Sequence, residues 1–233
     1  MGGLDGVILA IDTALAATSV CLLVPGGTAP VSAETVPMHS GHAEALFPQL
    51  DRVVARVEGG FDAVTRVAVT IGPGSFTGIR IGVAAARAIG LARRVPVVGV
   101  STLSALAAPA MAAGIRPPIV VAIDARHGNV FVQSFGSGGE TLLGPALMPA
   151  SEAARALAPG PLRLVGSGGP ILAIAAGALG IAADAEMGQT VPDIGFVARL
   201  GLLANPDYAL PRPLYLKVPD AKPPVPASLI GAR

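Results

Sequence analysis

The sequence predicts an α/β fold built from two similar halves, and two observations support this prediction. The segment I-V-V-A-I-D at 119–124 repeats V-I-L-A-I-D at 7–12, at an offset of 112 residues. Segments rich in β-branched residues also alternate with helix-like segments along the chain. Each half therefore shows the pattern β-β-β-α-β-α, which predicts two packed α/β units.

Composition and charge narrow the class of protein. Hydrophobic residues make up 52% of the 233 residues and charged residues only 13%, well below the usual quarter. The chain therefore has much apolar surface to bury, in its own core and against a partner. A net charge of +1 gives no electrostatic footprint for nucleic acid, so any contact with RNA is expected to be local or through another subunit.

The single cysteine and the uncharged stretches bear on the cellular compartment. Cys21 lies in the apolar run S-V-C-L-L-V, which predicts a small buried side chain in a reducing compartment. The N-terminal region lacks the basic segment of a signal peptide. The uncharged stretch 164–183 is interrupted by G-S-G-G-P, which leaves too few apolar residues to span a bilayer. We therefore expect a cytoplasmic protein.

The first half begins with three strands and an amphipathic helix. Strands are predicted at 7–12 and 19–24, and a third extended segment reaches residue 36, which together indicate an antiparallel meander. A helix is predicted over 41–57, because apolar residues recur there at spacings of three, four and seven. This apolar face comprises Ala43, Leu46, Phe47, Leu50, Val53, Val54 and Val57.

A strand, a turn and a helix form one unit between Arg66 and Arg94. The β-branched residues at 67–71 predict the strand, and Gly72-Pro73-Gly74 predicts a sharp turn. The following helix carries small residues at every fourth position, where another backbone can approach closely. These small residues are Gly78, Gly82, Ala86 and Gly90. The helix is apolar on nearly all sides, so both its own sheet and a partner are candidates to cover it.

The remaining elements complete the two halves. A strand at 97–100 and a helix from Ser101 end the first half, and a proline-rich, extended tail ends the chain. In the second half, strands are predicted at 119–124, 129–134, 140–148 and 162–165, and helices after Ser151, from Ile171 and between Asp193 and Ala204. Because each half opens with a strand that ends in aspartate, the duplication predicts an actin-like (ASKHA, RNase H-like) fold with subdomains at 1–106 and 107–233.

An actin-like fold directs attention to the cleft between the halves, where nucleotide phosphates and magnesium would be held. The candidate cleft residues are Asp12, Thr13, Asp124, Gly166, Gly168 and Gly169. An aspartate that closes a strand is also a common turn or cap residue. The loop G-P-G-S-F-T-G at 72–78 has neither the lysine of a P-loop nor the third glycine of a Rossmann fingerprint, which favours a tight structural turn.

No convincing catalytic set stands out. His39, His42 and Glu44 are candidate metal ligands, but the spacing H-x-x-H does not match H-E-x-x-H, and a solvated helix N-terminus is the favoured interpretation. No serine lies in a G-x-S-x-G context, and Cys21 has no evident histidine partner. The sequence therefore predicts neither a metal site nor an enzyme active site.

Several motifs in the expected order nevertheless resemble one family. They are I-L-A-I-D-T-A at 8–14, H-A-E-A-L-F-P at 42–48, G-P-G-S-F-T-G-I-R-I-G at 72–82, D-A-R-x-x-x-V-F at 124–131 and P-L-Y-L-K-V-P-D-A-K at 213–222. With these motifs the chain is similar to the TsaB (YeaZ) family. That resemblance implies a role in making N6-threonylcarbamoyladenosine beside the anticodon of tRNAs that read codons beginning with A.

The resemblance also implies partners. It predicts a non-catalytic scaffold that pairs with the enzyme subunit TsaD, and an ATPase subunit, TsaE, that joins the complex. No cofactor is expected in the isolated chain, whereas ATP or ADP and magnesium are expected in the complex. The chain would contact tRNA indirectly, through the complex. The first two helices would form the interface, and would also pair two copies of the isolated chain. The interface candidates are Ala43, Leu46, Phe47, Leu50, Val54, Gly78, Ile79, Gly82, Val83, Ala86 and Gly90.

Two further points bear on catalysis. The related enzyme carries a metal-binding pair of the form H-x-x-x-H, whereas His39 and His42 are one residue closer, which argues against metal-dependent catalysis in this chain. The alternative function is an ATP-dependent small-molecule kinase or ATPase that uses the actin-like cleft, with Asp12 and Asp124 near the nucleotide.

Overall fold

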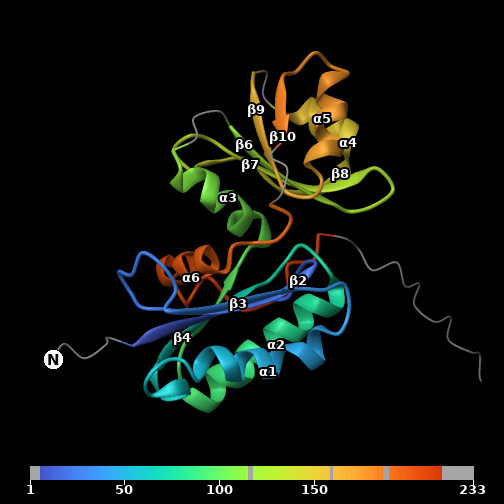
Figure 1. The fold of residues 1–233 in the computed structure, drawn as a ribbon. Helices are drawn as coiled ribbons and strands as arrows, with labels where there is room; N and C mark the ends of the chain where they lie inside the picture. The colour runs from blue at the N-terminus through green and yellow to red at the C-terminus, as the bar shows by residue number, and fades with distance from the viewer. Residues whose placement is uncertain (1–5, 115–117, 158–159, 186–188, 217–233) are drawn as a thin grey trace, which may run out of the picture.

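A computed structural model of the chain describes residues 6–114, 118–157, 160–185 and 189–216, which form two five-stranded sheets (Figure 1). The first sheet has the order β3-β2-β1-β4-β5, with β1 (Val7–Asp12), β2 (Ala17–Leu23), β3 (Ser32–Pro37), β4 (Val64–Thr70) and β5 (Val97–Val100). The second has the order β10-β9-β6-β7-β8, with β6 (Ile119–Asp124), β7 (Asn129–Phe135), β8 (Thr141–Pro149), β9 (Leu162–Val165) and β10 (Ala183–Ala185).

The two sheets share one topology, which confirms the predicted duplication. In each half the first three strands pair antiparallel, and the first strand also pairs parallel with the fourth. The first strands, β1 and β6, therefore lie in the middle of their sheets and are almost completely buried. Burial on both faces explains why V-I-L-A-I-D and I-V-V-A-I-D are continuous apolar runs that do not alternate with polar residues.

Helices cover both faces of each sheet. The helices are α1 (His42–Val54), α2 (Phe76–Arg93), α3 (Thr102–Ala112), α4 (Ala150–Ala156), α5 (Gly169–Gly177) and α6 (Ile194–Leu203), with a short 3-10 helix at Gly60–Ala63. In Figure 1, α1 and α2 lie side by side beneath the first sheet, and α6 lies above it. Helices α4 and α5 pack on one face of the second sheet, and α3 packs on its other face.

The two halves interlock through α3 and α6. Leu103 and Leu106 of α3 pack against Ile119 and Val121 of the second sheet. Val197 of α6 packs instead against Ile8 and Ala10 of the first sheet, so the last helix returns to the first half. The predicted boundary between 106 and 107 thus falls inside α3. By sequence order α3 belongs to the first half but packs on the second sheet, and α6 belongs to the second half but packs on the first.

Side-chain caps account for the starts of two helices. The apolar stretch that follows Ile171 is divided between a helix and a strand. Ser75 caps α2 by accepting a hydrogen bond from Gly78 N, and Asp193 caps α6 by accepting from Gly195 N. The helix predicted from Ile171 ends at Gly177, and residues 183–185 form β10 beside β9. None of the helices in the described ranges is long and apolar enough to cross a membrane. The part of the tail beyond residue 216 lies outside the described residues.

Candidate functional site

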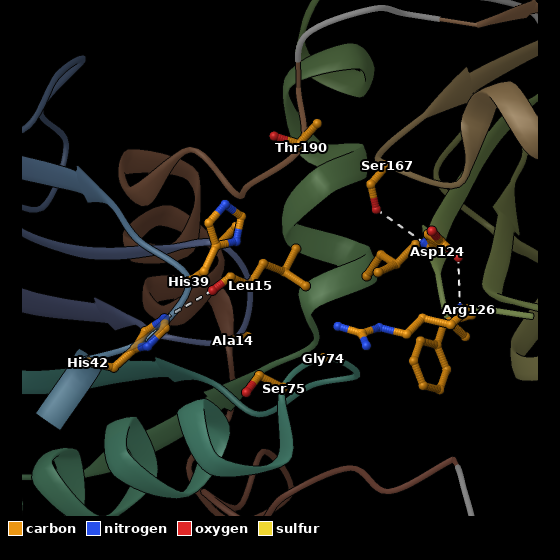
Figure 2. Close-up of a pocket in the computed structure, with 14 residues that line it drawn as sticks. Ala14, Leu15, His39, His42, Gly74, Ser75, Asp124, Arg126, Ser167 and Thr190 are labelled. Carbon is orange, nitrogen blue, oxygen red and sulfur yellow. Dashed lines mark hydrogen bonds between the residues drawn. The ribbon is translucent and has the colours of Figure 1, made fainter.

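A cavity with a volume of about 470 Å³ lies between the two halves (Figure 2). The first half contributes the segment after β1, the start of α1 and the turn before α2, and the second half contributes the loops after β6 and β9. Both polar and apolar groups line the cavity. The polar residues among them are His39, His42, Ser75, Asp124, Arg126, Ser167 and Thr190.

Asp12 does not face this cavity, contrary to the sequence-based expectation. Its side chain is completely buried, and Oδ1 accepts hydrogen bonds from Ala14 N at 3.0 Å and from Thr70 Oγ1 at 2.5 Å. Burial raises the pKa of the Asp12 carboxyl above its ordinary value, although the bonds from Thr70 and Ala14 act in the opposite direction. The neighbouring Thr13 is also buried, and its hydroxyl donates to Gly78 O. Neither residue is available to a ligand in the cleft.

Asp124 is the one predicted cleft residue that lines the cavity. It is exposed at the end of β6, its Oδ1 accepts from Arg126 N at 2.7 Å, and its own N–H donates to Ser167 Oγ at 3.1 Å. The predicted glycines instead allow close packing of the backbone on β6. A Cβ at Gly166 would lie 2.5 Å from Ala122 O, and one at Gly168 would lie 3.0 Å from the carbonyl carbon of Ala122. Gly169 begins α5 and is buried beside Leu164.

The two N-terminal histidines have different environments. His39 is exposed and lines the cavity, whereas His42 is buried and its Nε2 lies 3.1 Å from Leu15 O. The expectation of a wholly solvated helix start is therefore wrong for His42, which links α1 to the segment after β1. Within the described ranges, no group of three or more histidine, cysteine, aspartate or glutamate side chains is arranged to hold a metal ion.

The small residues of α2 face their own sheet. A Cβ at Gly78 would lie 2.1 Å from Thr13 O, one at Gly82 would lie 2.4 Å from Thr13 Oγ1, and one at Gly90 would lie 2.1 Å from Val97 Cγ2. Ala86, on the same stripe, is completely buried. The close backbone approach that the sequence predicts is thus confirmed, and it occurs within the chain.

Because of this packing, most of the residues expected at the partner interface are buried in the chain's own core. Nine of the candidates are buried in the first half and cannot contact a partner directly: Leu46, Leu50, Val54, Gly78, Ile79, Gly82, Val83, Ala86 and Gly90. Only Ala43 and Phe47 of that set are exposed. The apolar periodicity of α1 identifies the face that packs on the sheet, because burial in the core and burial in an interface select the same residue types.

The opposite side of these two helices is exposed and carries several large apolar side chains. We define the outer helix face as Ala43, Phe47, Phe76, Arg80, Ala84, Arg87 and Leu91, all of which are exposed. The α2 members recur at helical spacing and so lie on one stripe. Phe47 is 57% exposed, Phe76 52% and Leu91 83%. The Arg80 guanidinium lies 4.5 Å from the centre of the Phe76 ring, and the centre of the Tyr215 ring lies 5.3 Å from that of Phe76.

Comparison with protein families and known sequences gives a consistent assignment. A family model described as tRNA N6-adenosine threonylcarbamoyltransferase (TsaD) matches residues 17–173, which is more than half of the chain. The chain is 36% identical over 124 residues to the tRNA threonylcarbamoyladenosine biosynthesis protein TsaB of Escherichia coli, and this alignment covers 53% of the chain and 52% of that protein. The chain thus spans about half the length of the curated relatives named TsaB that it matches. It is 32% identical to an uncharacterised Mycobacterium tuberculosis protein, over 93% of the chain and 94% of that protein.

Solved structures agree with this assignment. A Pseudomonas aeruginosa protein described as similar to the peptidase YeaZ superimposes with a TM-score of 0.72 at 25% identity, over 91% of this chain and 100% of that one. A structure described as YeaZ from the same organism gives a TM-score of 0.69 at 26% identity, with the same coverage. Together with the repeated sheet topology, these matches establish the duplicated actin-like fold.

Proposed function

The chain belongs to the TsaB (YeaZ) family, and we propose that it is an accessory subunit in the synthesis of N6-threonylcarbamoyladenosine in tRNA. The names of its relatives support the pathway, and a cytoplasmic location is part of this proposal. In this account the chemistry belongs to a TsaD-type partner. The present chain positions or activates that partner.

The outer helix face is the main support for this proposal. Interfaces are enriched in aromatic residues and arginine at their centres, where few residues supply most of the binding energy. Phe47, Phe76 and Leu91 expose large apolar side chains, and Arg80 lies over one of the rings. Removing these groups from water favours a complex, and this gain offsets the entropy that the two partners lose on association.

The buried side of the same helices makes this face rigid. Leu46 and Leu50 anchor α1 in the core, and the close contacts of Gly78 and Gly82 hold α2 against Thr13. A rigid, preformed surface loses little conformational entropy on binding, which favours association. We propose that a TsaD-type subunit occupies this face in the complex, and that a second copy of the chain occupies it when the chain is alone.

A non-catalytic role is consistent with the environment of the predicted cleft acids. Asp12, which would be a candidate acid in a kinase-like cleft, is fully buried and holds two hydrogen bonds within the chain. Asp124 is exposed, and its Oδ1 is engaged by Arg126 N. The two acids therefore do not converge on one ligand, which weighs against the ATP-dependent kinase or ATPase that the sequence left open.

An omission experiment tests the proposal. The chain is mixed with TsaD-type and TsaE-type subunits, ATP, magnesium, the small-molecule substrates and tRNA that lacks the modification. The modified adenosine that forms in this tRNA is then measured. We expect modification with all three proteins and little without this chain. Equal modification without the chain would refute an accessory role, and modification by the chain alone would show that it is itself the enzyme.

A further inference from the structure

Arg126 occupies an unusual position at the edge of the cleft. Arg126 and His127, with φ angles of 67° and 54°, adopt the left-handed backbone conformation that non-glycine residues rarely adopt, and Gly128 continues it with a φ of 75°. Hydrogen bonds hold the turn, since Asp124 Oδ1 accepts from Arg126 N and Arg126 O accepts from Asn129 N at 3.0 Å. The turn thereby fixes the direction in which the Arg126 side chain leaves the backbone.

The Arg126 side chain extends into the cavity. Figure 2 shows its guanidinium pointing across the cleft, away from the second half and toward Leu15 and Gly74 of the first. Among the described residues, no carboxylate lies within ion-pair distance of this guanidinium. Arginine stays protonated in proteins and presents several donors in one plane, which suits the oxygens of a phosphoryl or carboxylate group.

The other walls of the cavity supply further donors. The hydroxyls of Ser167 and Thr190 line it from the second half, and His39 and Ser75 line it from the first. Ser75 is the N-cap of the 18-residue helix α2, so the positive end of the helix dipole also lies on this wall. Asp124 is the opposing charge on the lining, and Arg126 N occupies its Oδ1. A volume of about 470 Å³ is within the range of small-molecule sites.

We propose that this cavity binds a small oxyanion, a phosphoryl or carboxylate group, with Arg126 as its principal ligand and without a metal ion. This site is independent of the outer helix face, because the two share no residue. It lies in the predicted cleft between the halves, but its lining differs from the expected one. Asp12 and Thr13 are buried, and Arg126, Ser75 and Ser167 line the cavity beside Asp124.

Titration of the full-length chain with inorganic phosphate and, separately, with acetate tests the proposal at physiological ionic strength. Amide chemical shifts report both the Kd and the location of binding. We expect saturable shifts in the segments around Ser75, Asp124 and Ser167 with at least one of the two anions, and the tighter anion identifies the ligand class. Arg126→Gln should weaken this binding by about tenfold or more, because it removes a charge-assisted contact.

Arg155→Gln is the matched control, because it removes the same charge from an exposed position on α4 outside the cavity. It should leave the Kd unchanged. Three results would overturn the proposal: no saturable shifts with either anion, equal weakening by both variants, or binding that requires added magnesium. The last result would indicate a cation at Asp124 as the true ligand of the cleft.

Discussion

The hydroxyl of Thr13 donates a hydrogen bond to the carbonyl oxygen of Gly78 at 2.7 Å, and the backbone of Thr13 lies too close to Gly78 to leave room for a Cβ there. Thr13 follows the central strand β1, and Gly78 lies in the first turn of α2. This contact therefore joins the middle of the first sheet to the helix whose opposite side forms the outer helix face. The stability of the subunit and the geometry of its proposed interface depend on the same helix.

Gly78→Ala should destabilise the subunit. The new Cβ would lie 2.1 Å from Thr13 O, a backbone atom that cannot move away without displacing β1. Overpacking of this kind costs about 1–3 kcal/mol, so the free energy of unfolding measured by urea denaturation should fall by about that amount. Gly177→Ala is the control, because it ends α5 and has open space around it. If both substitutions have the same small effect, the close approach at Gly78 is not a constraint.

Asp12→Asn should change how stability depends on pH. Burial raises the pKa of Asp12 above 3.8, so the folded chain keeps a proton that the unfolded chain loses. The stability from that proton is complete below the unfolded pKa and is lost as the pH rises through the raised pKa. Above pH 3.8, the free energy of unfolding of the wild type should therefore fall relative to that of Asp12→Asn, by at most about 1.4 kcal/mol per pH unit.

Urea unfolding of both proteins over a pH series measures this difference. Asp51→Asn removes an exposed carboxyl on α1 and serves as the control, whose curve should run parallel to that of the wild type. Parallel curves for Asp12→Asn and the wild type would mean that the pKa of Asp12 is the same in the folded and unfolded chains, which would contradict the expected rise.

The isolated chain should self-associate through the outer helix face. Leu91→Asp places a charge on that face at a position that is 83% exposed in the single chain, so folding should be unaffected. In a dimer the new carboxylate would be taken out of water and the apolar contact of Leu91 would be lost. Arg87, one helical turn away, offsets part of this cost, so association should weaken by about tenfold or more. Sedimentation equilibrium measures the Kd. A monomeric wild-type chain, or an unchanged Kd for Leu91→Asp, would exclude this mode of pairing.

Much of the fold follows from local pattern. The repeat of V-I-L-A-I-D at β6, the alternation of strands and helices, and the glycine stripe of α2 are all properties of short segments, and each corresponds to an observed element. The exchange of α3 and α6 between the halves does not follow from any segment. It depends on which sheet face each apolar helix covers, and the sequence of a helix does not specify that face.

The sites could be predicted less well, for three physical reasons. Leu46 and Leu50 have the composition of an interface, but the core selects the same residues, and Phe47 between them is the exposed one. Asp12 has the position of a cleft acid, but only the structure reveals that Thr70 and Ala14 enclose it. Arg126 belongs to the motif D-A-R-x-x-x-V-F, but the direction of its side chain depends on a left-handed turn that the motif does not reveal. Gly82 packs against Thr13, so a larger side chain at this position would disturb the core and would not test the interface.

Binding of a TsaD-type subunit to the outer helix face can be tested by calorimetry, through the affinity of Phe47→Asp for that subunit. Ile174→Asp is the matched control, since Ile174 is 78% exposed on α5, in the other half. We predict that Phe47→Asp raises the Kd by at least about 100-fold while its melting temperature stays near that of the wild type, and that Ile174→Asp leaves the Kd unchanged. An equal Kd for the two variants would contradict the account.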